Sequence, residues 1–404
     1  MGIRGWICGA LLLACWGCAE PESLQPRADA GREDAGVRDA GPALHDAGVP
    51  PDSGIADAGA VGDAGATADA GPAVDAGPPW GTAIAAPPDT WTWVDFPDSA
   101  CSDGSPVGIG INPSPTSSNL LVYLNGGGAC WDAFTCLIAQ SATLGPYSQK
   151  LFQSDLASIG STIDRTDTQN PFRDWNFVFI PYCTGDVHAG DNVVTYTSGT
   201  TVSTFHHKGH ANVQAYLTRL GPTFPAPGKV LIVGDSAGGA GATVNYASAR
   251  AYWPNAKMYL INDSLPFFPP PETPPGTQSS ELANWGIGPL LKQICGDACP
   301  ADFSLAWAGL RERFPADRMA LLGYNQDQTM SAYYETLPAL FQLYLQQLGT
   351  QQLQPSNVKT FWVNGTGHTI LWSWATTNTT ASVNLRAWIT QMISDDPQWT
   401  SAGP

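Results

Sequence analysis

Short runs of apolar residues, rich in valine, isoleucine and leucine, recur along the chain from about residue 90 onward. Runs of about four to eight such residues, bounded by turn-forming residues, are typical of buried β-strands. Pro181 follows one of these runs directly and marks the end of that strand. We therefore predict strands at residues 90–94, 107–111, 119–124, 175–180, 229–233, 258–261, 318–323 and 357–363.

Other segments have apolar residues at helical spacing, which predicts helices between the strands. These segments are residues 211–220, 239–250, 330–348 and 381–394. Strands that alternate with helices form a mostly parallel sheet that is covered on both faces. The predicted fold class is therefore α/β.

Residues 264–300 interrupt this alternation. Eight prolines fall in the stretch, and proline breaks both helices and central strands. We therefore expect a Pro-rich insertion without a regular helix or central strand. A long insertion after a core strand commonly covers an active site.

The beginning of the chain is typical of an exported protein. Residues 1–18 carry one cation, Arg4, followed by an apolar run at 6–14 that is too short to cross a bilayer. Cys15 and Cys18 both lie in contexts that resemble the signal at which bacterial lipoproteins are cut and acylated. We expect export, with a lipid anchor at Cys15 or Cys18.

Residues 19–79 contain the triplet Asp-Ala-Gly eight times and almost no bulky side chains. Such a segment cannot bury enough apolar surface to offset the entropy of ordering, so we predict a disordered tether. Residues 80–404 would then form the catalytic domain. The formal net charge of −17 argues against nucleic acid as a partner and favours a neutral or esterified substrate.

The cysteines agree with export. Beyond residue 80 the chain has six cysteines, and an even number in an exported domain is typical of disulfides. Close spacing favours two pairs and leaves a third: Cys130 with Cys136, Cys295 with Cys299, and Cys101 with Cys183. A metal site is not expected, because His206-His207-x-x-His210 lacks the glutamate of the His-Glu-x-x-His zinc motif. No cofactor is expected either.

The segment Gly234-Asp235-Ser236-Ala237-Gly238 follows a predicted strand and leads into a predicted helix. This context is typical of a nucleophile elbow, a sharp turn in which only small residues fit two positions either side of the serine. The turn lifts the hydroxyl above the strand ends. We predict Ser236 as the nucleophile.

Two further residues follow later strands. Asp327 lies four residues beyond residue 323, and His368 lies five beyond residue 363. Because the carboxyl ends of parallel strands share one edge of the sheet, Ser236, Asp327 and His368 should converge there. The order Ser, Asp, His is that of α/β-hydrolases. Asp263 also follows a strand and is the alternative acid.

A glycine run follows the strand at 119–124. Gly126, Gly127 and Gly128 supply backbone N–H groups that can point at a developing oxyanion, together with the N–H of Ala237. This arrangement is the HGGG type of esterases with Asn125 in the place of histidine.

Several long motifs resemble the pectin acetylesterase and Notum family of carboxylesterases. They are residues 99–106 (SACSDGSP), 124–131 (LNGGGACW), 170–172 (NPF) and 179–190 (FIPYCTGDVHAG), continued by the elbow, Asp263-Ser264 and the Gly367-His368 loop. The resemblance covers roughly residues 90–375. It implies serine-dependent removal of acyl groups, either acetyl from plant polysaccharides or a fatty acyl group from a protein in the Notum branch.

The resemblance also implies particular residues. It implies that Gly127, Gly128 and Ala237 are the oxyanion donors, and it implies the links Cys101–Cys183 and Cys130–Cys136. The Notum branch has a tryptophan where this chain has Gly128, so the resemblance does not carry the Notum lipid pocket over.

We therefore expect an exported α/β-hydrolase that removes O-acyl groups, with O-acetyl favoured, from an extracellular polysaccharide through an acyl-enzyme at Ser236. Alternatives are a lipase or polyester hydrolase, or a catalytically idle surface-binding module on a tether.

Overall fold

The computed structural model describes residues 80–159, 162–351, 353 and 357–403. The predicted signal segment, lipid anchor and tether, at residues 1–79, lie outside the described residues.

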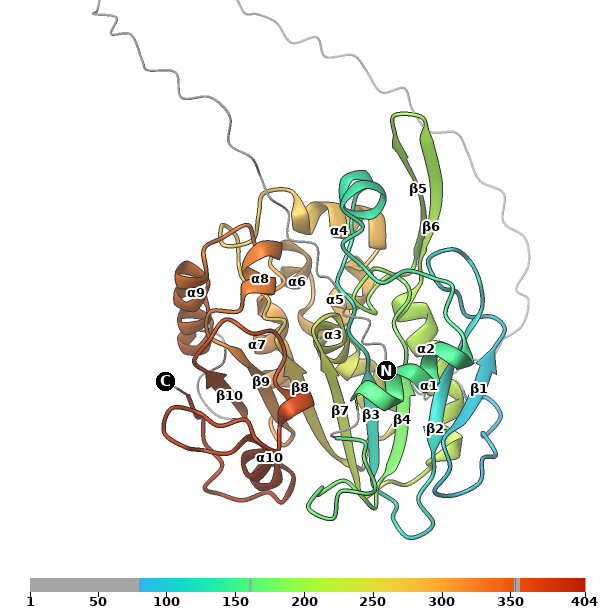
Figure 1. Cartoon of the computed structure of the whole chain (residues 1–404), viewed down its shortest axis with the longest axis vertical. Coiled ribbons are helices and arrows are strands. Elements are labelled where there is room, and N and C mark those ends of the chain that lie inside the picture. The colour runs from blue at the N-terminus through green and yellow to red at the C-terminus, as the bar shows by residue number, and fades with distance from the viewer. Residues whose placement is uncertain (1–79, 160–161, 352, 354–356, 404) are drawn as a thin grey trace, which may run out of the picture. The chain divides into compact units, whose positions relative to one another are not determined.

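An eight-stranded sheet forms the centre of the described part (Figure 1), in the order β1-β2-β4-β3-β7-β8-β9-β10. Its strands are β1 (Thr92–Phe96), β2 (Val107–Asn112), β3 (Leu120–Leu124), β4 (Asn176–Ile180), β7 (Lys229–Asp235), β8 (Lys257–Asp263), β9 (Arg318–Tyr324) and β10 (Val358–Val363). Neighbours from β4 to β10 run parallel, whereas β1 with β2 and β2 with β4 run antiparallel. The prediction of a mostly parallel sheet is confirmed.

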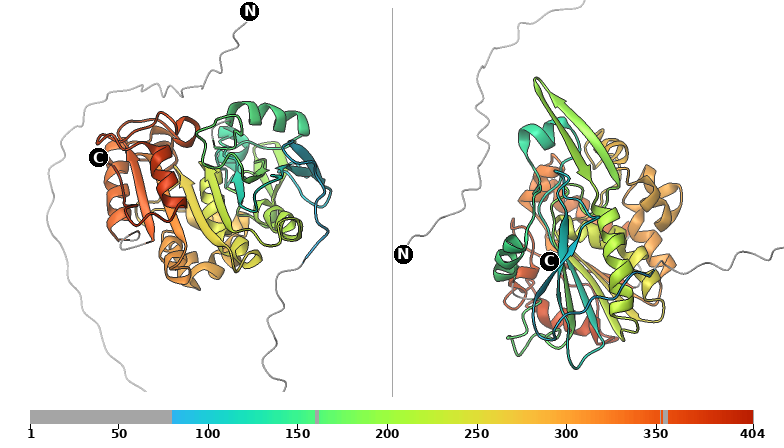
Figure 2. Two further views of the ribbon diagram at one scale, coloured as in Figure 1. Left: turned by 90° about the horizontal axis from the view of Figure 1, so that it is seen from below. Right: turned by 90° about the vertical axis from the view of Figure 1, so that its right-hand side faces the viewer.

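Helices cover both faces of this sheet (Figure 2). They are α1 (Gln149–Ile159), α2 (Gly209–Thr223), α3 (Ala237–Tyr252), α4 (Thr277–Trp285), α5 (Gly288–Cys295), α6 (Ala298–Ala301), α7 (Leu305–Arg313), α8 (Gln328–Tyr333), α9 (Pro338–Gln351) and α10 (Leu385–Ile393), with a π-helical turn η1 (Phe134–Ala139) and a 3-10 turn η2 (Leu371–Ser373).

Each face of the sheet has its own hydrophobic core, because successive strand residues point to opposite sides. On β3, Leu120 and Val122 belong to the core that includes side chains of α2, α3, α7 and α9. Leu121 and Tyr123 belong to the other core, with side chains of α1 and α10. The strands at the centre are buried on both faces, which explains why their sequences read as continuous apolar runs.

The expectation that residues 264–300 contain no regular helix was wrong. The structure places α4, α5 and α6 there. Six of the eight prolines lie between residues 266 and 275, before α4 begins. Pro289 lies in the first turn of α5, where its missing N–H leaves no helical hydrogen bond unmade. The position of each proline, and not their number, decides where helices form.

Two elements differ from the predicted pattern. The helix predicted at 330–348 is divided into α8 and α9, and Pro338 begins the second helix. A hairpin of β5 (Asn192–Ser198) and β6 (Thr201–His207) forms a separate two-stranded antiparallel sheet. It extends beyond the strand ends of the central sheet (Figure 1).

All three predicted disulfides are present: Cys101–Cys183, Cys130–Cys136 and Cys295–Cys299. Within the part of the chain that the structure describes, no helix combines the length and apolar character needed to cross a membrane.

Candidate active site

Ser236 lies in a sharp turn between β7 and α3. Its φ is 51° and its ψ is −124°, a conformation that L-residues rarely adopt. The turn requires glycine on both sides, since a Cβ on Gly234 would lie 2.2 Å from the carbonyl oxygen of Gly238, and one on Gly238 would lie 2.0 Å from that of Leu124. The Ser236 N–H donates to the carbonyl of Asp263 at 2.7 Å, which ties the turn to the end of β8.

The structure brings Ser236, His368 and Asp327 into one hydrogen-bonded chain. The Nε2 of His368 lies 2.8 Å from the Oγ of Ser236, and its Nδ1 lies 2.8 Å from the Oδ2 of Asp327. A carboxylate can only accept, so Nδ1 carries the proton and Nε2 is left to accept from the serine hydroxyl. The other oxygen of Asp327 accepts from the N–H of Met330 at 2.9 Å and caps α8. The Asp327 side chain is 1% exposed.

Asp263, the alternative acid, contacts the histidine loop and not the ring. Its Oδ2 accepts from the backbone N–H groups of residues 370 and 371, each at 2.8 Å. Its Oδ1 accepts from the Ser264 hydroxyl at 2.7 Å, and that hydroxyl oxygen accepts from the Thr369 N–H at 3.1 Å. Asp263 and Ser264 therefore hold the three residues that follow His368.

Negative charges surround the imidazole. Burial by itself would lower the pKa of His368, but the hydrogen bond and charge of Asp327, with the charges of Asp263 and Asp235, raise that pKa above its usual value. Asp235 is buried beside Ser236, and burial raises the pKa of its carboxyl to about 6. The Tyr123 hydroxyl donates to Asp235 at 2.6 Å and counteracts part of this shift. These groups therefore stabilise the imidazolium ion that forms when His368 takes up a proton.

The glycine loop lies beside the elbow. Among the hydrogen bonds between described residues, the N–H groups of Gly127, Gly128 and Ala237 have no acceptor. The carbonyl of Gly127 accepts from the Thr143 N–H at 2.6 Å, which fixes the loop. Gly128 has a φ of 76°, a conformation that favours glycine. Three donors are therefore free for a ligand.

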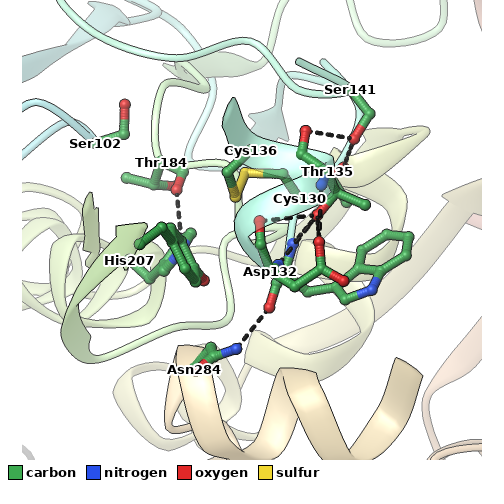
Figure 3. Close-up of a disulfide and its surroundings, with 12 residues drawn as sticks. Ser102, Cys130, Asp132, Thr135, Cys136, Ser141, Thr184, His207 and Asn284 are labelled. Carbon is green, nitrogen blue, oxygen red and sulfur yellow. Dashed lines mark hydrogen bonds between the residues drawn. A yellow bond between two sulfur atoms is a disulfide. The ribbon is translucent and has the colours of Figure 1, made fainter. Parts of the chain in front are cut away.

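The disulfide Cys130–Cys136 holds the segment that follows this loop (Figure 3). The Ser141 hydroxyl donates to the carbonyl of Ala129 at 2.6 Å. The indole N–H of Trp285, on α4, donates to the carbonyl of Cys130 at 2.9 Å. The insertion is thus joined to the segment that follows the glycine loop.

A pocket opens beside Gly128 and Ala237. Residues 264–300 supply half of its lining, in line with the expectation that this insertion covers the site. The wall is mostly apolar, and its aromatic members are Trp131, Phe267, Phe268, Trp285, Phe303, Tyr333 and Tyr334. Glu281 is the one carboxyl group among the described lining residues.

The histidine cluster at residues 206–210 makes its hydrogen bonds to groups other than Ser236, His368 and Asp327. The Nδ1 of His207 lies 3.0 Å from the carbonyl oxygen of Thr184 (Figure 3), and the Nδ1 of His210 lies 2.7 Å from the Oδ1 of Asn245. Across the described ranges, no three His, Cys, Asp or Glu residues are grouped so that they could hold a metal ion.

Sequence reasoning missed two titratable residues of the site. Asp235 was visible inside the elbow motif, but its burial against Tyr123 depends on β3 lying next to β7. Glu281 falls in the insertion that was expected to be irregular, and only the α4 helix brings it to the pocket. No local signal in the sequence marks either role.

The mostly parallel sheet, with a sharp serine turn at the carboxyl end of β7, defines the α/β-hydrolase fold. A crystal structure of the Wnt deacylase Notum from Drosophila is similar to the chain with a TM-score of 0.58 and 17% identity, covering 77% of this chain and 95% of that one. This likeness shows the fold.

Residues 92–282 match the model of the pectinacetylesterase family. The chain is 31% identical over 156 residues to the palmitoleoyl-protein carboxylesterase NOTUM of Schmidtea mediterranea, over 37% of this chain and 29% of that protein. It is 32% identical over 95 residues to pectin acetylesterase 11 of Arabidopsis thaliana, over 23% of this chain and 24% of that protein. The chain thus aligns with less than a third of the length of these relatives.

Proposed function

We propose that this protein is a serine carboxylesterase that removes O-acyl groups from an acylated polysaccharide. The observation that carries the proposal is the hydrogen-bonded chain from Ser236 Oγ through His368 to Asp327, next to three backbone N–H groups that have no acceptor among the described residues. Such a chain is the arrangement that activates a serine hydroxyl as a nucleophile.

In the proposed reaction, the Oγ of Ser236 attacks the ester carbonyl carbon while Nε2 of His368 takes the hydroxyl proton. The carbonyl oxygen becomes an oxyanion and accepts from the N–H groups of Gly127, Gly128 and Ala237. The tetrahedral intermediate then expels the sugar oxygen, which receives the proton from Nε2. A water molecule releases the acid from Ser236 by the same two steps, and Asp327 stabilises the imidazolium ion in each.

The substrate side of the proposal rests on the family. The matching model describes pectinacetylesterases, and one relative is a plant pectin acetylesterase, which favours O-acetyl groups on a polysaccharide. The net charge of −17 favours a neutral or esterified polymer over a polyanion. Three disulfides support export. Anchoring through Cys15 or Cys18 stays part of the proposal.

A second candidate is a lipase or polyester hydrolase, which the pocket favours. An acetyl group is small, whereas the mostly apolar lining of the pocket extends from Gly128 and Ala237 to side chains of α4. This space suits a longer acyl chain.

The test is acetate release from a panel of acetylated polysaccharides, together with the p-nitrophenol burst from p-nitrophenyl acetate. We expect both from the wild type and neither from S236A. The matched control is S248A, which changes a buried serine on the same helix, α3, outside the active-site hydrogen bonds. A burst that persists in S236A would refute the proposed nucleophile.

A further inference from the structure

The polar groups of the pocket wall are not evenly distributed. Most of them are already used within the protein: the hydroxyls of Thr273 and Tyr334 donate to the carbonyls of Phe268 and Pro266 at 2.8 and 2.5 Å. The hydroxyl of Tyr333 donates to the carbonyl of Ser141. These groups have no remaining proton to offer a ligand.

Two further polar side chains lie on one face of α4. Thr277 and Glu281 are four residues apart, so they lie one above the other on the same side of the helix, and both line the pocket. No side-chain hydrogen bond joins either residue to another described residue, while Gln278 beside them reaches the carbonyl of Phe268 at 3.4 Å. A hydroxyl and a carboxyl group thus form a polar edge in a mostly apolar pocket.

Glu281 is partly exposed, and its mostly apolar surroundings favour the neutral form of its carboxyl group. Among the lining residues that the structure describes there is no lysine, arginine or histidine, and the other titratable groups are Tyr333 and Tyr334. Burial raises the pKa of Glu281 to about 8. At pH 7 the group is therefore mostly a carboxylic acid, which can both donate and accept a hydrogen bond.

We propose that Glu281 and Thr277 bind a hydroxyl group on the acyl chain of the substrate, so that the pocket selects hydroxyacyl esters over plain alkyl esters. This inference rests on the proposed esterase function and names its acyl substrate. The acyl side is the one that enters, because a polysaccharide is too large to be enclosed by this pocket. The oxyanion donors Gly128 and Ala237 stand at the wall of the same pocket, which connects it to the reacting carbonyl.

Other acyl groups fit the wall less well. A plain alkyl chain would bury the polar atoms of Glu281 and Thr277 without partners, which is unfavourable. An ammonium group would have to lose its hydration in an apolar pocket and would require the proton to leave Glu281. A hydroxyl group pairs with both side chains and needs no change of charge.

The experiment compares ethyl esters of hexanoate, 6-hydroxyhexanoate and 6-aminohexanoate, and of the corresponding eight-carbon acids, with the full chain at pH 7. We expect kcat/KM for the hydroxy ester to exceed that for the alkyl ester of equal length by about tenfold or more, at the length that reaches Glu281. E281L should abolish or reverse this preference, and E281Q should keep most of it, since an amide also donates and accepts. Equal preference in wild type and E281L, or a preference for the amino ester, would overturn the inference.

The pH dependence gives a second readout. The preference of the wild type should fall as pH rises through about 8, where Glu281 loses its proton, and the preference of E281Q should not change over this range. A preference that falls equally in both would point to another group.

The melting temperature of each variant shows whether it is folded, and only folded variants are compared. Binding of 6-hydroxyhexanamide to S236A, measured by calorimetry, separates the two proposals. Hydrolysis of acetate esters without selectivity for hydroxyacyl esters would refute this inference but not the proposed function. Tight, Glu281-dependent binding of 6-hydroxyhexanamide without any ester hydrolysis would refute the proposed function but not the binding site.

Discussion

The two sides of Ser236 differ in how far their polar groups are hydrogen-bonded within the protein. On the side of His368 nearly every polar group has a partner: Asp327 holds the ring, and Asp263 holds the loop behind it through two backbone N–H groups. On the side of the pocket the wall is apolar, and Glu281 has no hydrogen-bond partner among the described residues. Hydrogen-bonded groups fix the geometry of a site, whereas an unpaired group is available to bind a ligand. The first side should therefore control rate and the second should control choice of substrate.

The largest effect should come from replacing the carboxylates on the His368 side, Asp327 and Asp263, by amides one at a time. D327N keeps the helix cap but lets the amide hold the wrong imidazole tautomer, so kcat/KM should fall on the order of 10⁴-fold. D263N loses one acceptor for two backbone N–H groups, and we expect a loss of about tenfold. Initial rates on p-nitrophenyl acetate measure both. A loss in D263N as large as that in D327N would mean that the two roles are assigned the wrong way round.

A smaller effect is expected at the boundary between the two sides. In G128A the new Cβ would lie 2.2 Å from the carbonyl oxygen of Ser141, at a φ of 76°, so the loop must shift and its N–H must leave the oxyanion position. We expect kcat to fall about a hundredfold with every ester.

The matched control for this change is G199A in the β5–β6 turn. Gly199 also has a positive φ, 58°, but nothing lies within 4 Å of its Cβ position. Its rate should be that of the wild type. Equal losses in both variants would attribute the effect to backbone strain and not to the oxyanion donors.

On the pocket side, T277F should change selectivity without changing the chemistry. A phenyl ring on this face of α4 would fill part of the pocket, so we expect about a tenfold loss of kcat/KM on octanoyl esters and little change on acetyl esters. The ratio of the two rates is the measurement. Equal losses on both esters would show that the pocket is not the acyl site.

The smallest effect should appear in the pH profile. His368 must be neutral to accept the proton, so kcat/KM falls as pH drops through the pKa of this residue in the free enzyme. Because surrounding carboxylates raise that pKa, the midpoint should lie above the usual histidine value of about 6.5. D263N removes one of these charges, so its midpoint should move to lower pH. A midpoint below 6.5 in the wild type would contradict this electrostatic account.

Part of the fold and of the site could be predicted because it depends on local pattern. The elbow around Ser236 needs glycine at positions 234 and 238, and both glycines lie within five consecutive residues of the sequence. The strands of the central sheet are continuous apolar runs because both faces are buried. The hairpin β5–β6 was missed, since its alternating and partly exposed residues give a weaker signal.

The sequence by itself determined which chemical groups follow the strands and the class of fold that carries them, because strand, turn and helix preferences act between neighbouring residues. Only the tertiary structure decided that Asp327 reaches the His368 ring while Asp263 holds its backbone, although both follow strands in the same sheet. Only the tertiary structure placed Glu281 in an apolar wall. Both outcomes depend on the paths of loops between distant segments, and hydrogen-bond contacts change over distances of less than an ångström, which no local pattern specifies.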